Sequence, residues 1–201
     1  VNVNCPVGVD WQEEKHAVCY FTFHDQYYIY ICSGALLNSA YWYRRPYFLT
    51  ANHCLNSQLL ARTVVAYFNH EQNGCSNGGI KKNPATLSGA DLMMTLQATD
   101  LTLLELNQNP PVQWQPYYAG WDVTGSAGRS AVSIHHPEGK MKKISIDYDP
   151  PTNMKIPIYW GENDYSEINT HWQVSFDLGK TAGGSSGAPL FNHEKRIIGQ
   201  L

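Results

Sequence analysis

Short apolar runs alternate with polar connections along most of the chain. The runs are rich in Val, Ile, Tyr, Phe and Thr, and Asn, Gly, Pro and Asp separate them, a pattern typical of β-strands and their turns. The runs that we expect to be strands are residues 17–23, 27–37, 63–70, 92–97, 101–106, 130–136, 142–148 and 171–178. Because helical periodicity is weak, these short strands predict an all-β barrel or sandwich.

Two of the connections indicate how the strands are grouped. Residues 24–26, His-Asp-Gln, are expected to form a hairpin turn between the first two strands. Residues 107–111, Asn-Gln-Asn-Pro-Pro, follow the strand at 101–106 and are expected to link two halves of the chain. With 201 residues the chain can bury a core as one domain or as two small halves that share one.

Composition and charge narrow the class of protein. Charged residues make up 15% of the chain and the net charge is −3, without a basic run, so no nucleic-acid partner is expected. No apolar stretch approaches a membrane span, and no signal peptide begins at Val1. We therefore expect a soluble mature form or a trimmed piece of one.

The five cysteines favour disulfide bonds over a zinc or redox centre. They include no Cys-x-x-Cys pair, and a low charge with abundant Tyr, Trp and Asn is typical of secreted proteins. The odd number leaves one thiol unpaired. Because Cys19 lies inside the apolar run 17–23, we expect it to be a small buried core residue.

Three segments carry candidate chemistry. They place His53 in 48–55, Asp100 immediately before the strand at 101–106, and Ser186 in 183–191, Gly-Gly-Ser-Ser-Gly-Ala-Pro-Leu-Phe. A serine hydroxyl is nearly inert at neutral pH until an imidazole base, oriented by a carboxylate, takes its proton. The order His, Asp, Ser is that of chymotrypsin-like double barrels, and not of subtilisins or α/β-hydrolases.

We therefore predict that Ser186 is a nucleophile, His53 its base and Asp100 the group that orients the base, in a cleft between the two halves. Asp91, in a Gly-Ala-Asp-Leu turn, is the competing candidate for the acid. The segment around Ser186 taken alone is also compatible with a Gly/Ser-rich loop that has no chemistry. The backbone N–H groups of Gly184 and Ser186 are the expected oxyanion-hole donors.

Neither a metal nor a cofactor is expected. His135 and His136 are adjacent, and neighbouring residues on a strand point to opposite faces, so the two cannot easily share one metal ion. Acyl transfer by serine also needs no cofactor.

Beyond these three motifs, the sequence resembles the bacterial lysyl endopeptidases, a branch of the trypsin-like serine proteases. The similar segments run in order through nearly the whole chain, and they include residues 32–38, 47–54, 100–107, 119–122, 133–145 and 185–201. The resemblance implies a chymotrypsin-like double six-stranded β-barrel over residues 1–201, with a first barrel at about 1–106 and an incomplete second barrel at about 112–201.

The same resemblance implies further features of the site and the protein. It implies the disulfides Cys32–Cys54 and Cys5–Cys75, and it places Trp160 near the substrate, beside the catalytic histidine. It implies a secreted bacterial serine endopeptidase that acts on proteins or peptides, with cleavage after lysine. A monomer is favoured.

Three departures bear on specificity. Ser185 stands where trypsin has the aspartate that pairs with a freed N-terminus, and Lys180 stands where trypsin has its specificity aspartate. In the lysyl endopeptidases the specificity aspartate comes later in the sequence, and the resemblance implies that it lies past Leu201. The strand that aligns the substrate backbone lies in the same later region. We therefore expect residues 1–201 alone to be a poor enzyme. Two alternatives stay open: a protease that prefers acidic or small side chains, and a non-catalytic binding protein.

Overall fold

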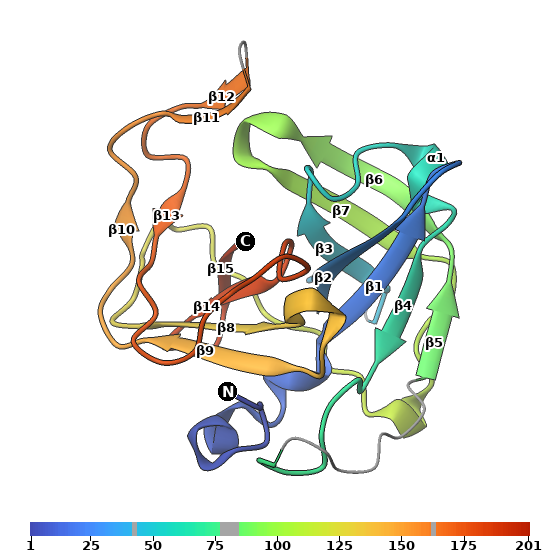
Figure 1. The fold of residues 1–201 in the computed structure, drawn as a ribbon, viewed down its shortest axis with the longest axis horizontal. Coiled ribbons are helices and arrows are strands. Elements are labelled where there is room, and N and C mark those ends of the chain that lie inside the picture. The colour runs from blue at the N-terminus through green and yellow to red at the C-terminus, as the bar shows by residue number, and fades with distance from the viewer. Residues whose placement is uncertain (42–43, 77–84, 162–163) are drawn as a thin grey trace.

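The computed structural model describes residues 1–41, 44–76, 85–161 and 164–201, and strands make up most of it (Figure 1). Its helical pieces are short. They are one α-helix, α1 (Gln58–Ala61), and five 3-10 turns, η1 (Pro6–Trp11), η2 (Glu14–His16), η3 (Gln97–Thr99), η4 (Val112–Trp114) and η5 (Pro137–Gly139). Within the described ranges, no helix has both the length and the apolar character needed to cross a membrane.

The first half is an antiparallel sheet in the order β5-β4-β1-β2-β3-β7-β6. Its strands are β1 (Val18–His24), β2 (Ile29–Leu37), β3 (Tyr47–Ala51), β4 (Val65–Phe68), β5 (Ala85–Ser88), β6 (Ala90–Leu96) and β7 (Leu101–Leu106). Only Gly89 separates β5 from β6, so the two edges of the sheet are the two arms of one bent strand. The sheet therefore closes into a barrel of six strands, as the sequence predicted for this half.

The second half is built on a smaller antiparallel sheet in the order β15-β14-β8-β9. Its strands are β8 (Ala131–His135), β9 (Lys143–Asp147), β14 (Pro189–Asn192) and β15 (Ile197–Gln200). Two separate strand pairs extend from it, β10 (Thr152–Asn153) with β13 (Trp172–Gln173) and β11 (Ile158–Gly161) with β12 (Asp164–Ser166). Figure 1 shows the β11–β12 hairpin standing away from the main sheet.

The strands can be compared with the sequence expectations, and two of those expectations, the run 171–178 and the first hairpin turn, need correction. For the second half, the resemblance implies an incomplete barrel rather than a defined number of strands, and the main sheet there has four strands in the described part of the chain. The run 171–178 is predicted as one strand, but it pairs in two separate places: Trp172–Gln173 pair with β10, and Leu178 forms an isolated bridge with Ile146. Its residues from 172 to 178 do alternate between half-buried and exposed positions, as in a strand. The first hairpin exists, but its connection lies at 25–28, one residue later than expected, where the Asp25 carboxylate accepts from the backbone N–H groups of Tyr27 and Tyr28.

Two apolar cores result from strand alternation. One fills the first barrel, where Phe21, Phe48 and Leu104 are fully buried. The other lies between the two halves, and residues near the N-terminus, such as Val3 and Trp11, pack there against Phe191. Since the backbones of residues 1 and 3 also hydrogen-bond to residues 144 and 142, the N-terminal segment joins the second half as well as the first.

The cysteines fix two connections. The structure contains the disulfides Cys5–Cys75 and Cys32–Cys54, the pairing that the resemblance implied. The first ties the N-terminal segment to the loop after β4, and the second ties β2 to the residue next to His53. Cys19 is a buried free thiol, as predicted from its position in an apolar strand.

Candidate active site

Both carboxylate oxygens of Asp100 form hydrogen bonds with His53. Its Oδ2 lies 2.6 Å from the Nδ1 of His53, and its Oδ1 accepts the backbone N–H of His53 at 2.7 Å. Asp100 is buried, whereas the imidazole of His53 is exposed. With Nδ1–H donated to the carboxylate, the other ring nitrogen, Nε2, is left as the acceptor that a general base requires.

The backbone around Asp100 explains how the carboxylate reaches this place. The short turn η3 leads into Asp100, which has a φ of 50° in the left-handed region that Asp tolerates better than most residues. The Asp100 carbonyl accepts the N–H of Asn52 at 2.9 Å and a hydrogen bond from the Gln200 side chain. The loops that carry His53 and Asp100 are thereby tied to each other and to β15 of the second half.

Ser186 lies in the loop before β14, and the first barrel holds this loop in place. The Ser33 N–H donates to the Ser186 carbonyl at 2.8 Å, and the Ser33 hydroxyl donates to the Gly184 carbonyl at 2.8 Å. Gly187 packs so closely against the barrel that a Cβ there would lie 2.2 Å from the Thr50 hydroxyl and 2.3 Å from the Ser33 carbonyl. A side chain at position 187 would therefore push Ser186 away from the first half.

The backbone N–H groups of this loop divide into two sets. Those of Ser185, Gly187 and Ala188 donate to carbonyl oxygens within the loop or at Leu201. Those of Gly184 and Ser186 have no acceptor in the part of the chain that the structure describes. Gly184 has a φ of +85°, which glycine adopts without strain. Because unpaired N–H groups are rare in a folded protein, this pair is suited to bind an anionic oxygen.

Ser186 and His53 line the same cavity, of about 500 Å³. Its remaining walls come from the first barrel, chiefly the Cys32–Cys54 disulfide and the end of the β1–β2 hairpin. The residues predicted as nucleophile and base thus line one solvent-accessible space that is large enough for part of a peptide.

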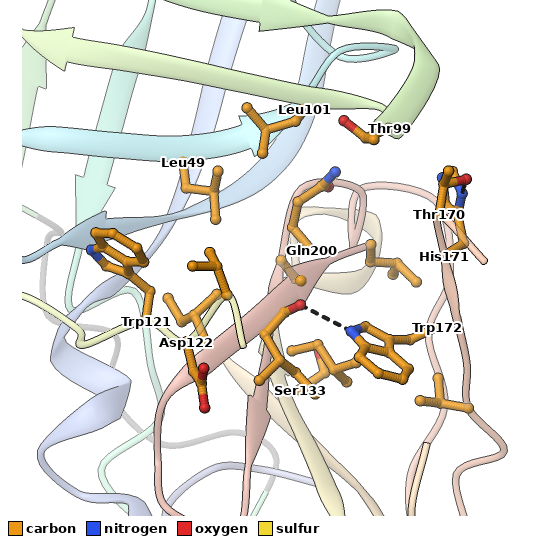
Figure 2. A pocket seen from close by; sticks show the side chains of 18 of the residues that line it. Leu49, Thr99, Leu101, Trp121, Asp122, Ser133, Thr170, His171, Trp172 and Gln200 are labelled. Atoms are coloured by element: carbon orange, nitrogen blue, oxygen red, sulfur yellow. Dashed lines mark hydrogen bonds between the residues drawn. The ribbon is translucent and has the colours of Figure 1, made fainter. Parts of the chain in front are cut away.

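Figure 2 shows a second cavity, of about 390 Å³, between β15 and the β13 segment. Thr99 and Leu101, the two neighbours of Asp100 in the chain, lie on one side of it, and Trp172 lies on the other, with its indole N–H donated to the Ile198 carbonyl at 3.0 Å. Its lining is mainly apolar. Neither His53 nor Ser186 lines it, so we assign it no part in the chemistry.

The other sequence-predicted residues lie as follows. Asp91, the competing acid, is exposed on β6 and accepts from the Gln58 side chain. Lys180 is exposed and lines neither cavity. Trp160 belongs to β11, but its side chain falls outside the described part of the structure, so its placement beside the substrate stays a prediction.

The structure also brings residues to the site that the sequence analysis did not place there. Ser33 and Gln200 link the halves at the site, and His135, buried on β8, contacts Ser185 beside the nucleophile. His135 and His136 do direct their rings to different partners: His135 contacts Ser185 and Ser145, whereas His136 contacts the Lys140 carbonyl. None of these contacts has a sequence signature, because each joins segments of no fixed spacing.

Comparison with known proteins points to the lysyl endopeptidases, the class that the sequence resembles. A family model described as lysyl endopeptidase, C-terminal domain, matches residues 1–201. Over 120 residues, 58% of this chain, the sequence is 35% identical to a lysyl endopeptidase of Pseudomonas aeruginosa, and the match covers 26% of that relative's length. The chain therefore corresponds to only a part of this curated relative.

Solved structures confirm the predicted chymotrypsin-like fold. The active form of the Rv3671c protease from M. tuberculosis has a TM-score of 0.61 and 16% identity, over 97% of this chain and 72% of that chain. A thermostable serine protease, AL20, from an extremophilic microorganism has a TM-score of 0.61 and 15% identity, over 94% of this chain and 83% of that chain. At these identities the likeness establishes the fold alone.

Proposed function

Because the chain belongs to the lysyl endopeptidase family, we propose that it is the peptidase unit of a secreted bacterial serine endopeptidase that cleaves after lysine. The observation that carries this proposal is the arrangement at His53. The buried Asp100 carboxylate lies 2.6 Å from Nδ1 of the imidazole, and the imidazole lines the same cavity as Ser186. Fold alone does not require these three residue types to meet at one place.

In the proposed mechanism, Nε2 of His53 takes the proton of the Ser186 hydroxyl as Oγ attacks the peptide carbonyl. The ring becomes an imidazolium, and Asp100 stabilises it through the Nδ1–H that it already accepts. The negative oxygen of the tetrahedral intermediate binds to the unpaired N–H groups of Gly184 and Ser186.

The same groups act when this intermediate breaks down, and His53 now serves as the acid. The imidazolium gives its proton to the leaving amine, which departs and leaves an acyl ester on Ser186. Water then attacks the ester with His53 as base, and the second intermediate collapses to release the acid and restore the Ser186 hydroxyl. The cycle needs no cofactor.

The proposal of specificity for lysine is based on family membership alone. We assign recognition of the lysine side chain to none of the described residues. A peptide library incubated with the full-length protein and read by mass spectrometry tests this specificity directly, with the full-length protein carrying Ser186→Ala as the inactive reference. Ser175→Ala, at an exposed serine of the second half, is the matched control. We expect cleavage after lysine by wild type and Ser175→Ala, and none by Ser186→Ala.

Two results would overturn parts of this proposal. Dominant cleavage after Glu or Asp would contradict lysine specificity and favour a protease for acidic side chains, with Lys180 as the residue to examine. Binding of peptides without cleavage of any sequence would contradict catalysis itself and favour a binding protein built on a protease fold.

A further inference from the structure

A buried histidine outside the triad contacts the residue next to the nucleophile. We propose that His135 is a positioning residue: its imidazole holds the Ser185 hydroxyl, and through it keeps the N–H groups of Gly184 and Ser186 aimed at the oxyanion. This inference rests on the proposed function, because it concerns the same acyl-transfer site. His135 itself touches neither the proposed nucleophile nor the base in the described structure.

The contact is short and fully shielded from water. His135 ends β8 and has no exposed surface, and Ser185 likewise has none. The His135 Nδ1 lies 2.8 Å from the Ser185 hydroxyl oxygen, and its Nε2 lies 3.0 Å from the hydroxyl oxygen of Ser145 on β9. The ring is therefore fixed at both nitrogens, between the sheet on one side and the nucleophile loop on the other.

The proposal includes a direction for these hydrogen bonds. The Ser185 hydroxyl oxygen accepts the N–H of Ala182 at 3.2 Å, and we infer that the hydroxyl donates its own proton to Nδ1 of His135. The ring proton then lies on Nε2, which donates it to Ser145. The neutral ring satisfies both contacts, and burial favours this form by lowering the pKa of His135 to about 4.

Ser185 is the residue around which the nucleophile loop turns. Its N–H donates to the Ala182 carbonyl at 2.9 Å, and its carbonyl accepts the Ala188 N–H at 3.0 Å. The first barrel fixes only carbonyl oxygens of this loop, at Gly184 and Ser186. The second half holds the loop through the Glu138 N–H, which donates to the Gly183 carbonyl, and through the Ser185 side chain, which contacts β8. Rotation of Ser185 would turn the peptide unit that carries the Ser186 N–H, and it would displace Gly184 through the unit before Ser185.

The first test removes the Ser185 hydroxyl and compares the effect on kcat with that of removing the hydroxyl of another buried serine. Ser133 lies on β8, is buried, and its hydroxyl has no hydrogen-bond partner within the described residues, so Ser133→Ala removes a hydroxyl without breaking the network. We expect Ser185→Ala to lower kcat about 10- to 100-fold, with KM changed less than about twofold, because a misdirected donor weakens the transition state more than the bound substrate. Ser133→Ala should retain the wild-type kcat.

The second test separates positioning from bulk stability. In His135→Asn the side-chain oxygen occupies the place of Nδ1 and can still accept from Ser185, whereas in His135→Gln the amide replaces only the contact of Nε2 with Ser145. Each variant loses one buried hydrogen bond, so similar losses in urea stability are expected. We expect His135→Asn to retain a kcat within about threefold of wild type and His135→Gln to lose as much as Ser185→Ala.

A measurement on the wild-type protein does not depend on any variant folding. Nitrogen-15 NMR of labelled histidine should show His135 at pH 7 as the neutral tautomer with its proton on Nε2. The opposite tautomer would overturn the inference, as would equal kcat values for wild type and Ser185→Ala or equal losses of kcat in the two His135 variants.

The reaction of Ser186 with a small fluorophosphonate separates this inference from the proposed function. If wild type is not labelled, the proposed function has failed and the inference falls with it. If wild type is labelled and Ser185→Ala reacts at the same rate, only the inference is contradicted.

Discussion

Acidification should destabilise this protein through His135 before its carboxylates titrate. The imidazole is completely buried, and burial lowers its pKa in the folded state to about 4, against 6.5 in an unfolded chain. Between these two values the unfolded state binds a proton that the folded state does not. Stability is therefore fully present above pH 6.5 and is lost as the pH falls toward 4.

The size of the effect follows from the difference between the two pKa values. One unit is worth about 1.4 kcal/mol, so a difference of about 2.5 units corresponds to a loss of about 3 kcal/mol once the pH is below 4. Between pH 7 and pH 4.5 the loss is about 2 kcal/mol, a large share of the 5–15 kcal/mol typical of a folded domain. His136, also buried with its pKa lowered, adds to the fall in the same direction.

Urea unfolding at intervals between pH 7 and pH 4.5 measures this dependence. The free energy of unfolding of His135→Gln should fall less steeply than that of wild type, by about 2 kcal/mol over the range. His24→Gln, which removes an exposed histidine, should follow the wild-type curve. Parallel curves for wild type and His135→Gln would show that His135 is not held neutral, and would refute both the sign and the size of this reasoning.

Three further predictions concern the site and the cysteines. Asp100→Asn should lower kcat about 10⁴-fold with little change in KM, because the imidazole loses its orienting carboxylate, and steady-state kinetics that show less than a tenfold loss would contradict that role. Replacement of the Cys5–Cys75 disulfide, which spans 70 positions, by two serines should cost about 4 kcal/mol in urea unfolding, and an unchanged midpoint would contradict it. Burial raises the pKa of Cys19 to about 12, so iodoacetamide at pH 8 should modify it only after unfolding, and rapid modification of the native protein would refute its burial.

The sequence was sufficient for the features that short segments encode. The three motifs around His53, Asp100 and Ser186 identified the residues that the fold brings together, since each motif carries its own turn or strand. Short runs rich in Val, Ile, Tyr, Phe and Thr predicted most strands of the first half, because such side chains pack well on the surface of a sheet.

Features that depend on tertiary packing could not be predicted in this way. The bend at Gly89 that closes the first barrel is a single glycine between two strand-like runs, and nothing local distinguishes it from a loop. Ser33 reaches Gly184 across 151 positions, and His135 reaches Ser185 across 50. In the run 171–178 the apolar residues favoured one strand, but the run pairs with two different neighbours, at Trp172–Gln173 and at Leu178.

The central claim is that Ser186 is an activated nucleophile, and the site of covalent labelling tests it most directly. The protein is treated with a fluorophosphonate at pH 8 and mapped by mass spectrometry, with Ser186→Ala alongside. We expect a single modification on Ser186 in wild type and none in Ser186→Ala. Labelling of the neighbouring Ser185, or no labelling of the native wild-type protein, would contradict it.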